Sequence, residues 1–567
     1  MFSGGSESLL PPLVAIVLAI ATRRVVLPLA SGVFVGSLLL ARKNSAPWWD
    51  SFSVFYESMW VSVFSTTHLQ ALLFSVLLGA MVGVLEAGGG MQCLIAKLSG
   101  RIRTRRGGQC LIAASGLAVF FDDYANTLLV GGTMRSTADK FGISREKLAY
   151  LVDSTAAPVA GLSVVSTWAM IEISYIADGL RIAGVPEGTA AFEMFLQSIA
   201  YRFYPWLALA MVFIIAWTGR DFAGMAKAEK ASLAIRDQTS DESSGERVTS
   251  YPRLLWLAAV LPVCGCVASV LIVLVVTGIE GADVDRNGTS GWLKTVSDVL
   301  GEGDSYLALI VGGAVGLVLA FGLHRIIGWI SYRILGMAVL RGASQMMPAM
   351  LILWFAWALS AMTEPDKLDT GGYLAAVLSE RLDPQLLPTV VFMIAGAMAF
   401  ATGTSWGTMG ILTPLSVALA IRLDPVSGPG GAIALSTCGA VLAGAIFGDH
   451  CSPISDTTVL SSRASGCDHL AHVRTQFPYA LLVGIVCVAA GTIPSALNVS
   501  PWVCLAMGVI MLLTLVRLLG KAPAENETTE NDTSENETTE NETTENESAG
   551  NQATGNDAAG NSSVDIA

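Results

Sequence analysis

Apolar runs long enough to cross a membrane recur along most of this chain. About 20 consecutive apolar residues span the hydrocarbon core as a helix, and such runs extend from residue 9 to residue 518. The composition agrees, because 53% of the residues are hydrophobic, 14% are charged and the mean hydropathy is +0.58. The sequence therefore predicts an all-α polytopic membrane protein with about twelve transmembrane segments and disfavours a large soluble enzyme.

Polarity divides the chain into four parts. We expect residues 1–218 to form a first transmembrane half, residues 219–253 a polar cytoplasmic linker, and residues 254–520 a second transmembrane half. Residues 521–567 are acidic and rich in Asn, Glu and Thr, so they bury little apolar surface and are predicted to be disordered. Much of the net charge of −13 lies in this tail and says little about the membrane body.

Basic loops predict which side of the membrane each segment faces. Residues 97–106 and 135–147 are rich in Lys and Arg, and the positive-inside rule places both in the cytoplasm. The segment between them, residues 110–130, should therefore enter the membrane and return, as a re-entrant hairpin or a broken helix pair. Short basic loops are expected beside membrane helices, so no nucleic-acid partner is predicted. We expect a multi-pass protein of the cell inner (plasma) membrane, in which residues 148–176 form one crossing and the last hairpin consists of spans 479–497 and 501–518.

A cluster of polar residues follows the apolar run 432–446. Asp449, His450 and Asp456 lie within residues 447–458, and Pro453 between the two aspartates prevents one continuous regular helix. Broken backbone at membrane depth persists only where it is buried in protein or lines a wet cavity. Ionisable groups there indicate an ion or substrate path, and a polar loop outside the membrane is the alternative.

The first half carries a similar element. Asp122, Asp123, Asn126 and Thr127 interrupt the apolar stretch 110–130, which is costly unless these groups are paired, hydrated or bound to an ion. Two adjacent residues on a helix point roughly 100° apart. We therefore expect one aspartate to bind a ligand while the other caps a helix or pairs.

Glycine and proline also break an apolar segment in the second half, at residues 402–414. Thr404 and Ser405 lie there beside backbone carbonyls of the kind that hold a dehydrated sodium ion. Close packing at Gly403 and Gly407 is the alternative. Interrupted segments at corresponding places in the two halves indicate the substrate site of a transporter.

These patterns define one predicted ion or substrate site, in which a carboxylate holds either a proton or a sodium ion. Its residues are Asp122, Asp123, Asn126, Thr127, Asp153, Thr404, Ser405, Asp449, His450, Ser452, Asp456 and Thr457. The candidates for sodium from these patterns are Thr404, Ser405 and Asp449. His450 is a candidate pH sensor or a structural hydrogen-bonding residue, and we expect His469 and His472 to be surface residues of a loop.

Three motifs resemble segments of the NhaC-type sodium/proton antiporter family. They are Phe447-Gly448-Asp449-His450-Cys451-Ser452-Pro453-Ile454-Ser455-Asp456-Thr457-Thr458, Phe121-Asp122-Asp123-Tyr124-Ala125-Asn126-Thr127, and Gly403-Thr404-Ser405-Trp406-Gly407-Thr408. The resemblance extends from about residue 72 to residue 518.

That resemblance implies an elevator-like carrier of the ion-transporter superfamily, with a hairpin and a broken helix in each inverted repeat. In related carriers an Asn-Thr pair at a hairpin tip binds sodium, and Asn126-Thr127 and Thr404-Ser405 match it by resemblance. The implied partners are sodium ion, proton and lipid bilayer, with no cofactor and with a homodimer left open. Family members include organic-acid exchangers, so a sodium- or proton-coupled malate/lactate-type carrier is the alternative function.

Two classes of intramembrane enzyme are further alternatives. Asp122-Asp123-x-x-Asn126 is similar to the aspartate-rich motif of membrane prenyltransferases, but a second such motif and nearby basic residues are lacking. Gly448-Asp449 is similar to part of the intramembrane aspartyl protease motif, but Ile446 replaces its first glycine. We therefore predict a transporter and no catalytic residue.

Overall fold

The computed structural model describes residues 5–22, 24–99, 102–185, 190–239, 252, 254–281, 303–378 and 383–522. These residues belong to one compact unit. They are helical and contain no named strand, apart from an isolated antiparallel bridge between Asp221 and Lys521. The all-α prediction is confirmed, and the predicted disordered tail lies, except for its first two residues, outside the described part of the chain.

The described residues contain ten helices that are long and apolar enough to cross a membrane, or up to twelve when each of two bent helix pairs counts as one span. The expected number of transmembrane segments is confirmed. The first half contains α1 (Leu10–Thr22), α2 (Val26–Lys43), α3 (Asp50–Phe64), α4 (Thr66–Gly88), α5 (Gly90–Ser99), α6 (Arg105–Ala118), α7 (Asp123–Thr133), α8 (Arg135–Lys140), α9 (Arg145–Leu162), α10 (Thr167–Ala183), α11 (Ala190–Ser198) and α12 (Phe203–Thr218).

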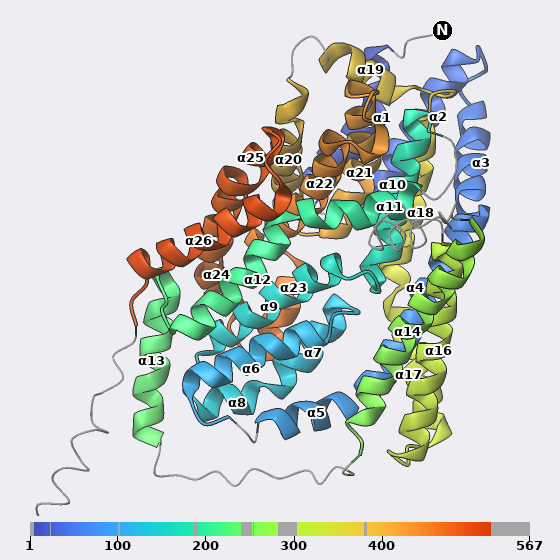
Figure 1. The fold of residues 1–567 in the computed structure, drawn as a ribbon. Coiled ribbons are helices and arrows are strands. Elements are labelled where there is room, and N and C mark those ends of the chain that lie inside the picture. The colour runs from blue at the N-terminus through green and yellow to red at the C-terminus, as the bar shows by residue number, and fades with distance from the viewer. Residues whose placement is uncertain are drawn as a thin grey trace, which may run out of the picture. The chain divides into compact units, whose positions relative to one another are not determined.

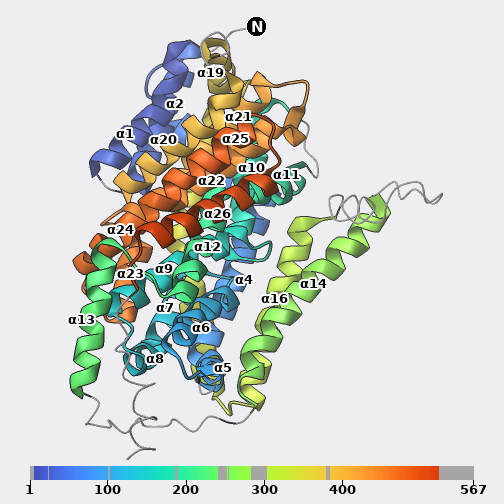
Figure 2. The same cartoon turned by 60° about the vertical axis from the view of Figure 1, so that its left-hand side comes forward.

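The remaining helices lie in the predicted linker, which contains α13, and in the second half. They are α13 (Ala223–Thr239), α14 (Leu257–Gly281), α16 (Ser305–Ile326), α17 (Tyr332–Gln345), α18 (Met347–Met362), α19 (Thr370–Leu378), α20 (Leu387–Thr402), α21 (Ser405–Leu423), α22 (Ala432–Cys451), α23 (Asp456–Ser465), α24 (His469–Val486), α25 (Ile493–Ala496) and α26 (Pro501–Leu519). A π-helical segment, Cys487–Thr492, joins α24 to α25. Helices α14 and α16 lie side by side and pack with α4 and α17 (Figures 1 and 2).

Helix breaks occur in both halves. In the first half α6 and α7 are separated by residues 119–122, as predicted for a broken helix pair. We expected residues 148–176 to form one crossing, but α9 and α10 are separated by residues 163–166 and bent by 50°. Pro158 lies within α9, and the break comes after it.

In the second half α20 and α21 are separated by Gly403 and Thr404, and α22 and α23 by residues 452–455. Gly403 adopts the left-handed conformation with φ 70°, which favours glycine at a helix end. A Cβ at Gly403 would lie 2.7 Å from the carbonyl oxygen of Ile454, so the two breaks pack directly on one another. The breaks predicted at Pro453 and at residues 402–404 are confirmed.

Helix α24 begins earlier than its apolar pattern suggested. We expected the span to start at Tyr479, but the helix starts at His469, where the side chain of Asp468 accepts a hydrogen bond of 2.9 Å from the backbone N–H of Ala471. This N-cap starts the helix before its apolar part. Histidines 469 and 472 therefore lie on a helix and not on a loop.

Part of the predicted linker is an ordered helix. Helix α13 packs against α9 and α24, and its Glu229 is fully buried in an ion pair with Arg105. Just before α13, the buried carboxylate of Asp221 pairs with the buried ammonium of Lys147 and accepts a hydrogen bond of 2.9 Å from Tyr479 Oη. These contacts fix the beginning of the linker on helices of both halves. Residues 240–251 and 253 of the linker lie outside the described part of the chain.

We predict that Lys147→Met lowers the free energy of unfolding by about 3–5 kcal/mol, because removing one partner leaves the Asp221 carboxylate buried without its counter-ion. The measurement is the melting temperature of the purified protein in detergent. The double variant Lys147→Met/Asp221→Asn should recover most of the loss. Arg42→Met, which removes an exposed ion pair with Glu7, is the matched control and should change stability little. Equal losses for Lys147→Met and Arg42→Met would contradict the prediction.

Candidate functional site

A group of buried aspartates lies where three helices meet. Helices α7, α9 and α23 pack on one another, and α6 and α22 also pack on α9 (Figures 1 and 2). Two breaks therefore converge on α9, the one between α6 and α7 and the one between α22 and α23. Helix α9 brings Asp153 to this point, and the start of α7 brings Asp122 and Asp123.

Asp122 and Asp123 take different roles. The Asp122 carboxylate caps α7, because Oδ1 accepts a hydrogen bond of 2.7 Å from Ala125 N, and Oδ2 accepts one of 3.0 Å from Thr167 Oγ1. Asp123 is fully buried, and neither of its carboxylate oxygens has a hydrogen-bond partner among the described residues. The expected capping role thus falls to Asp122, and Asp123 is the aspartate whose charge is left without a partner.

Asn126 holds the break between α6 and α7 together. Its amide nitrogen donates hydrogen bonds to the carbonyls of Gly116 at 2.7 Å, Val119 at 3.1 Å and Thr155 at 3.3 Å. Its Oδ1 is buried without a partner among the described residues. Asn126 therefore satisfies backbone carbonyls and still has an oxygen to offer to a cation. The hydroxyl of Thr127 donates to Asp123 O at 2.8 Å and keeps its lone pairs.

Asp449 and Asp153 are each held at one carboxylate oxygen by a threonine of α23. Thr457 Oγ1 donates to Asp449 Oδ2 at 2.8 Å, and Thr458 Oγ1 donates to Asp153 Oδ2 at 2.9 Å. Both aspartates are 1% exposed, and Oδ1 of each has no partner among the described residues. Neighbouring threonines thus hold two carboxylates from opposite halves of the chain beside the same short helix.

Asp456 completes the group from the first turn of α23. Its Oδ1 accepts a hydrogen bond of 2.9 Å from Thr457 N, and its Oδ2 accepts one from the hydroxyl of Tyr124 in α7. Unlike the other aspartates here, Asp456 is exposed. The helices that carry Asp456, Asp123 and Asp153 pack on one another, so negative charges at these positions repel.

Four carboxylates therefore meet without a basic partner. None of Asp123, Asp153, Asp449 and Asp456 forms an ion pair with Lys, Arg or His within the part of the chain that the structure describes. Asp123 and Asp456 begin helices, where the positive end of the dipole stabilises negative charge. Asp449 lies in the last turn of α22, at the negative end, where its charge is least stabilised.

Hydrogen bonds between side chains connect Asp153 with Gln476, His472 and His469 of α24. Gln476 Nε2 donates to Asp153 Oδ2 at 2.6 Å and to His450 O at 3.0 Å, so Gln476 Oε1 faces His472 Nε2 at 2.9 Å. His472 Nδ1 lies 2.8 Å from Ser462 Oγ, which is 3.1 Å from Nδ1 of the half-buried His469. His472 is fully buried, so its predicted surface position is wrong.

His450 lies beside the same hydrogen-bonded side chains. Its Nδ1 is 3.1 Å from Tyr204 Oη, and its Nε2 is buried without a partner among the described residues. The indole of Trp168 lies next to the carboxylate of Asp123. The ring of Trp168 lies 5.1 Å from the ring of Trp406 in α21.

The remaining predicted residues support the breaks. Ser452 Oγ donates to Phe400 O at 2.8 Å, and Ser405 Oγ donates to Ala445 O at 3.3 Å. Thr404 is the N-cap residue of α21 but makes no side-chain cap bond. No described contact joins Thr404 or Ser405 to Asn126 or Thr127. The alternative of close packing is also observed, because a Cβ at Gly407 would lie 2.6 Å from the side chain of Val25.

Oxygen atoms dominate the groups that could hold a cation. Unpartnered oxygens of Asp123, Asn126, Asp153 and Asp449 lie on α7, α9 and α22. Hard cations prefer oxygen ligands such as carboxylates and amide carbonyls, so these residue types suit sodium. Among the described residues, however, no group of three or more His, Cys, Asp or Glu side chains is arranged to hold a metal ion.

Sequence reasoning missed several residues of this site, namely Tyr124, Thr458, His472, Gln476 and Tyr204. The polar pair His472 and Gln476 is spaced i, i+4, which places both on one face of a helix. That spacing was the available signal, and it was hidden because the helix was expected to begin at Tyr479.

Comparison with known proteins places the chain in a family. The model of the Na+/H+ antiporter family matches residues 159–492, which is more than half of the 567 residues. An uncharacterised protein of Haemophilus influenzae is 33% identical over 486 residues, covering 85% of this chain and 89% of that protein. The malate-2H+/Na+-lactate antiporter of Bacillus subtilis is 33% identical over 199 residues, but these cover only 32% of this chain and 40% of that antiporter.

Among solved structures, the YdaH transporter of Alcanivorax borkumensis aligns over 83% of this chain and 89% of its own, with 14% identity and a TM-score of 0.49. The family membership that the three sequence motifs suggested is confirmed by the family model. The chain is a multi-pass membrane protein that belongs to the Na+/H+ antiporter family.

Proposed function

We propose that this protein is a secondary transporter of the plasma membrane that exchanges sodium ions for protons. The observation that carries the proposal is the group of Asp123, Asp153 and Asp449, which are buried with unpartnered carboxylate oxygens and without a basic counter-ion among the described residues. A buried carboxylate must be neutralised by a proton or a cation. One site that accepts either, but not both, couples the two flows.

Asp449 is the carboxylate at which we place the exchange. Thr457 holds one of its oxygens and the other is free of protein partners among the described residues. Its place at the C-terminal end of α22 and the nearby charges of Asp456 and Asp153 all disfavour an unneutralised negative charge. Asp123 is its counterpart from the first half, and the site requires neither a cofactor nor a catalytic residue.

A second candidate is exchange of small organic acids, with sodium or protons as the coupling ion. The similarity to the malate-2H+/Na+-lactate antiporter supports it, although the match covers less than half of either chain. The four aspartates would repel an organic anion, which favours the cation as the species bound at this site. Malate and lactate pulses in the flux assay below separate the two functions.

We predict that Asp449→Asn abolishes sodium-driven proton flux while leaving folding intact. Asparagine keeps the acceptor for Thr457 but cannot titrate or neutralise a cation, and a neutral amide is easier to bury than a carboxylate. The measurement is proton flux against pH in proteoliposomes at equal protein content.

The matched control is Asp468→Asn. Asp468 caps α24 from an exposed position, and asparagine caps helices equally well. Its flux should equal that of the unchanged protein. Near-normal flux from Asp449→Asn would remove this residue from the exchange site.

His472 is predicted to act on the site by positioning Gln476. Gln476 Nε2 donates to Asp153 and to the carbonyl of His450, so its Oε1 accepts a hydrogen bond from the N–H of His472. His472 thereby fixes the orientation in which Gln476 holds Asp153. His472→Phe should leave Oε1 without a donor, a loss of about 1 kcal/mol or more. That loss corresponds to about a fivefold rise in the sodium concentration for half-maximal flux.

A double-mutant cycle tests this route. If His472 acts through Gln476, the variants His472→Phe and Gln476→Ala should have similar effects, and the double variant should be no worse than either. Additive effects would show that His472 acts on the site independently of Gln476.

A further inference from the structure

A polar cavity of about 150 Å³ lies apart from the four carboxylates, along α4 and α10 and the start of α16. His68, Ser174, Asp178, Arg181 and Tyr306 contribute its polar lining. Asp178 is eleven positions after Thr167, the residue that binds Asp122. The cavity is therefore about 16 Å further along α10 than the carboxylate site, at 1.5 Å per residue.

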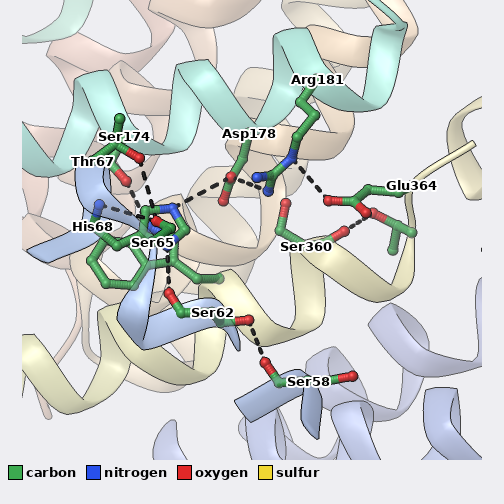
Figure 3. A network of polar contacts seen from close by, with 12 residues as sticks. Ser58, Ser62, Ser65, Thr67, His68, Ser174, Asp178, Arg181, Ser360 and Glu364 are labelled. Atoms are coloured by element: carbon green, nitrogen blue, oxygen red, sulfur yellow. Dashed lines mark hydrogen bonds and ion pairs between the residues drawn. The ribbon is translucent and has the colours of Figure 1, made fainter. Parts of the chain in front are cut away.

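The charges of this cavity are partly paired. Asp178 is 2% exposed, and its Oδ1 accepts a hydrogen bond of 2.6 Å from Arg181 Nη2. Arg181 Nε lies 2.8 Å from Glu364 Oε1, so its guanidinium group lies between two carboxylates (Figure 3). The second oxygen of Asp178, Oδ2, is buried and makes no hydrogen bond of standard geometry among the described residues, and the hydroxyl of Ser360 is the donor near this carboxylate. A buried carboxylate oxygen without a partner indicates a missing donor.

His68 is held in one orientation at the wall of the cavity. Its ring stacks on that of Trp357 at 3.8 Å with an interplanar angle of 4°, and Trp357 Nε1 donates to Ser174 Oγ at 2.6 Å. The Nδ1 atom of His68 lies 2.5 Å from the carbonyl oxygen of Ser62. A carbonyl only accepts hydrogen bonds, so Nδ1 carries the proton. The Nε2 atom faces Asp178 (Figure 3). In the neutral ring Nε2 carries a lone pair and accepts hydrogen bonds.

Two acceptors therefore face each other. His68 Nε2 is 3.9 Å from Asp178 Oδ1, which is too long for a direct hydrogen bond. A donor that reaches both groups satisfies them. A primary ammonium group has three N–H donors and a positive charge that the carboxylate stabilises. Sodium is a poorer match, because hard cations prefer oxygen ligands to an imidazole nitrogen.

The size and remaining lining of the cavity limit the ligand. An apolar cavity of about 150 Å³ in another protein holds benzene, so the space suits a ligand of about that size. Ala177, Leu180 and Val185 line it with apolar surface for a short carbon stem. We propose that this cavity binds the ammonium group of a compact primary amine between Asp178 and His68. The inference is independent of the proposed sodium/proton exchange.

The test is calorimetric titration of the full-length protein in detergent with n-propylammonium. We expect saturable binding to the unchanged protein and at least a tenfold loss of affinity in Asp178→Asn. Tetramethylammonium has the same charge but no N–H donor, so it should bind at least tenfold more weakly. No binding of n-propylammonium to the unchanged protein, or equal binding of the two cations, would overturn the proposal.

Two further variants keep the test decisive. Ala177→Leu fills the cavity with three extra carbons but leaves Asp178 and His68 in place, so it should also abolish binding without altering the ion pairs. Asp449→Asn removes the exchange carboxylate and should bind n-propylammonium as the unchanged protein does. Binding retained in Ala177→Leu would place the amine elsewhere, and binding lost in Asp449→Asn would place it at the carboxylate site.

Discussion

The structure depends on satisfying the backbone groups that are freed where helices break inside a membrane protein. Water is absent from the hydrocarbon core, so each free carbonyl or N–H needs a partner from the protein. Asn126 supplies three hydrogen bonds at the break between α6 and α7. Arg202 donates to the carbonyl of Gly161 at the end of α9. Ser452 donates to the carbonyl of Phe400, and Gln476 donates to the carbonyl of His450. Each break is thereby held in one conformation.

Those fixed breaks determine the electrostatics of the site. Asp123 and Asp456 are the first residues of helices that start after a break. Asp449 lies in the last turn of a helix that ends just before a break. Two buried basic residues neutralise other carboxylates, because Arg202 pairs with Glu172 and Lys147 pairs with Asp221. The carboxylates around α9 have no such partner among the described residues. Their charge must therefore be neutralised by a proton or a cation, which is the physical basis for proposing exchange.

Much of this arrangement was predictable from local chemistry. Pro453 and the glycines near residue 403 indicated where the second-half helices break, and the paired aspartates indicated a break near Asp122. The sequence did not predict the break between α9 and α10, because Pro158 lies inside α9 and not at its end. The residues of the break, 163–166, are two serines and two valines, without the glycine or proline that marks the breaks of the second half. The start of α24 was missed because an exposed N-cap begins the helix ahead of its apolar part.

The sequence by itself determined the class of protein, the spans, most of the breaks and the charged residues near them, because hydrophobicity and backbone sterics act over short stretches of chain. Tertiary structure alone decided which carboxylate caps a helix and which stays unpartnered, since Asp122 depends on Thr167 and Asp153 depends on Thr458 and Gln476. It also decided that His472 is buried and that His68 faces Asp178. These are contacts between residues far apart in the chain, and no local pattern specifies which donor will meet which acceptor.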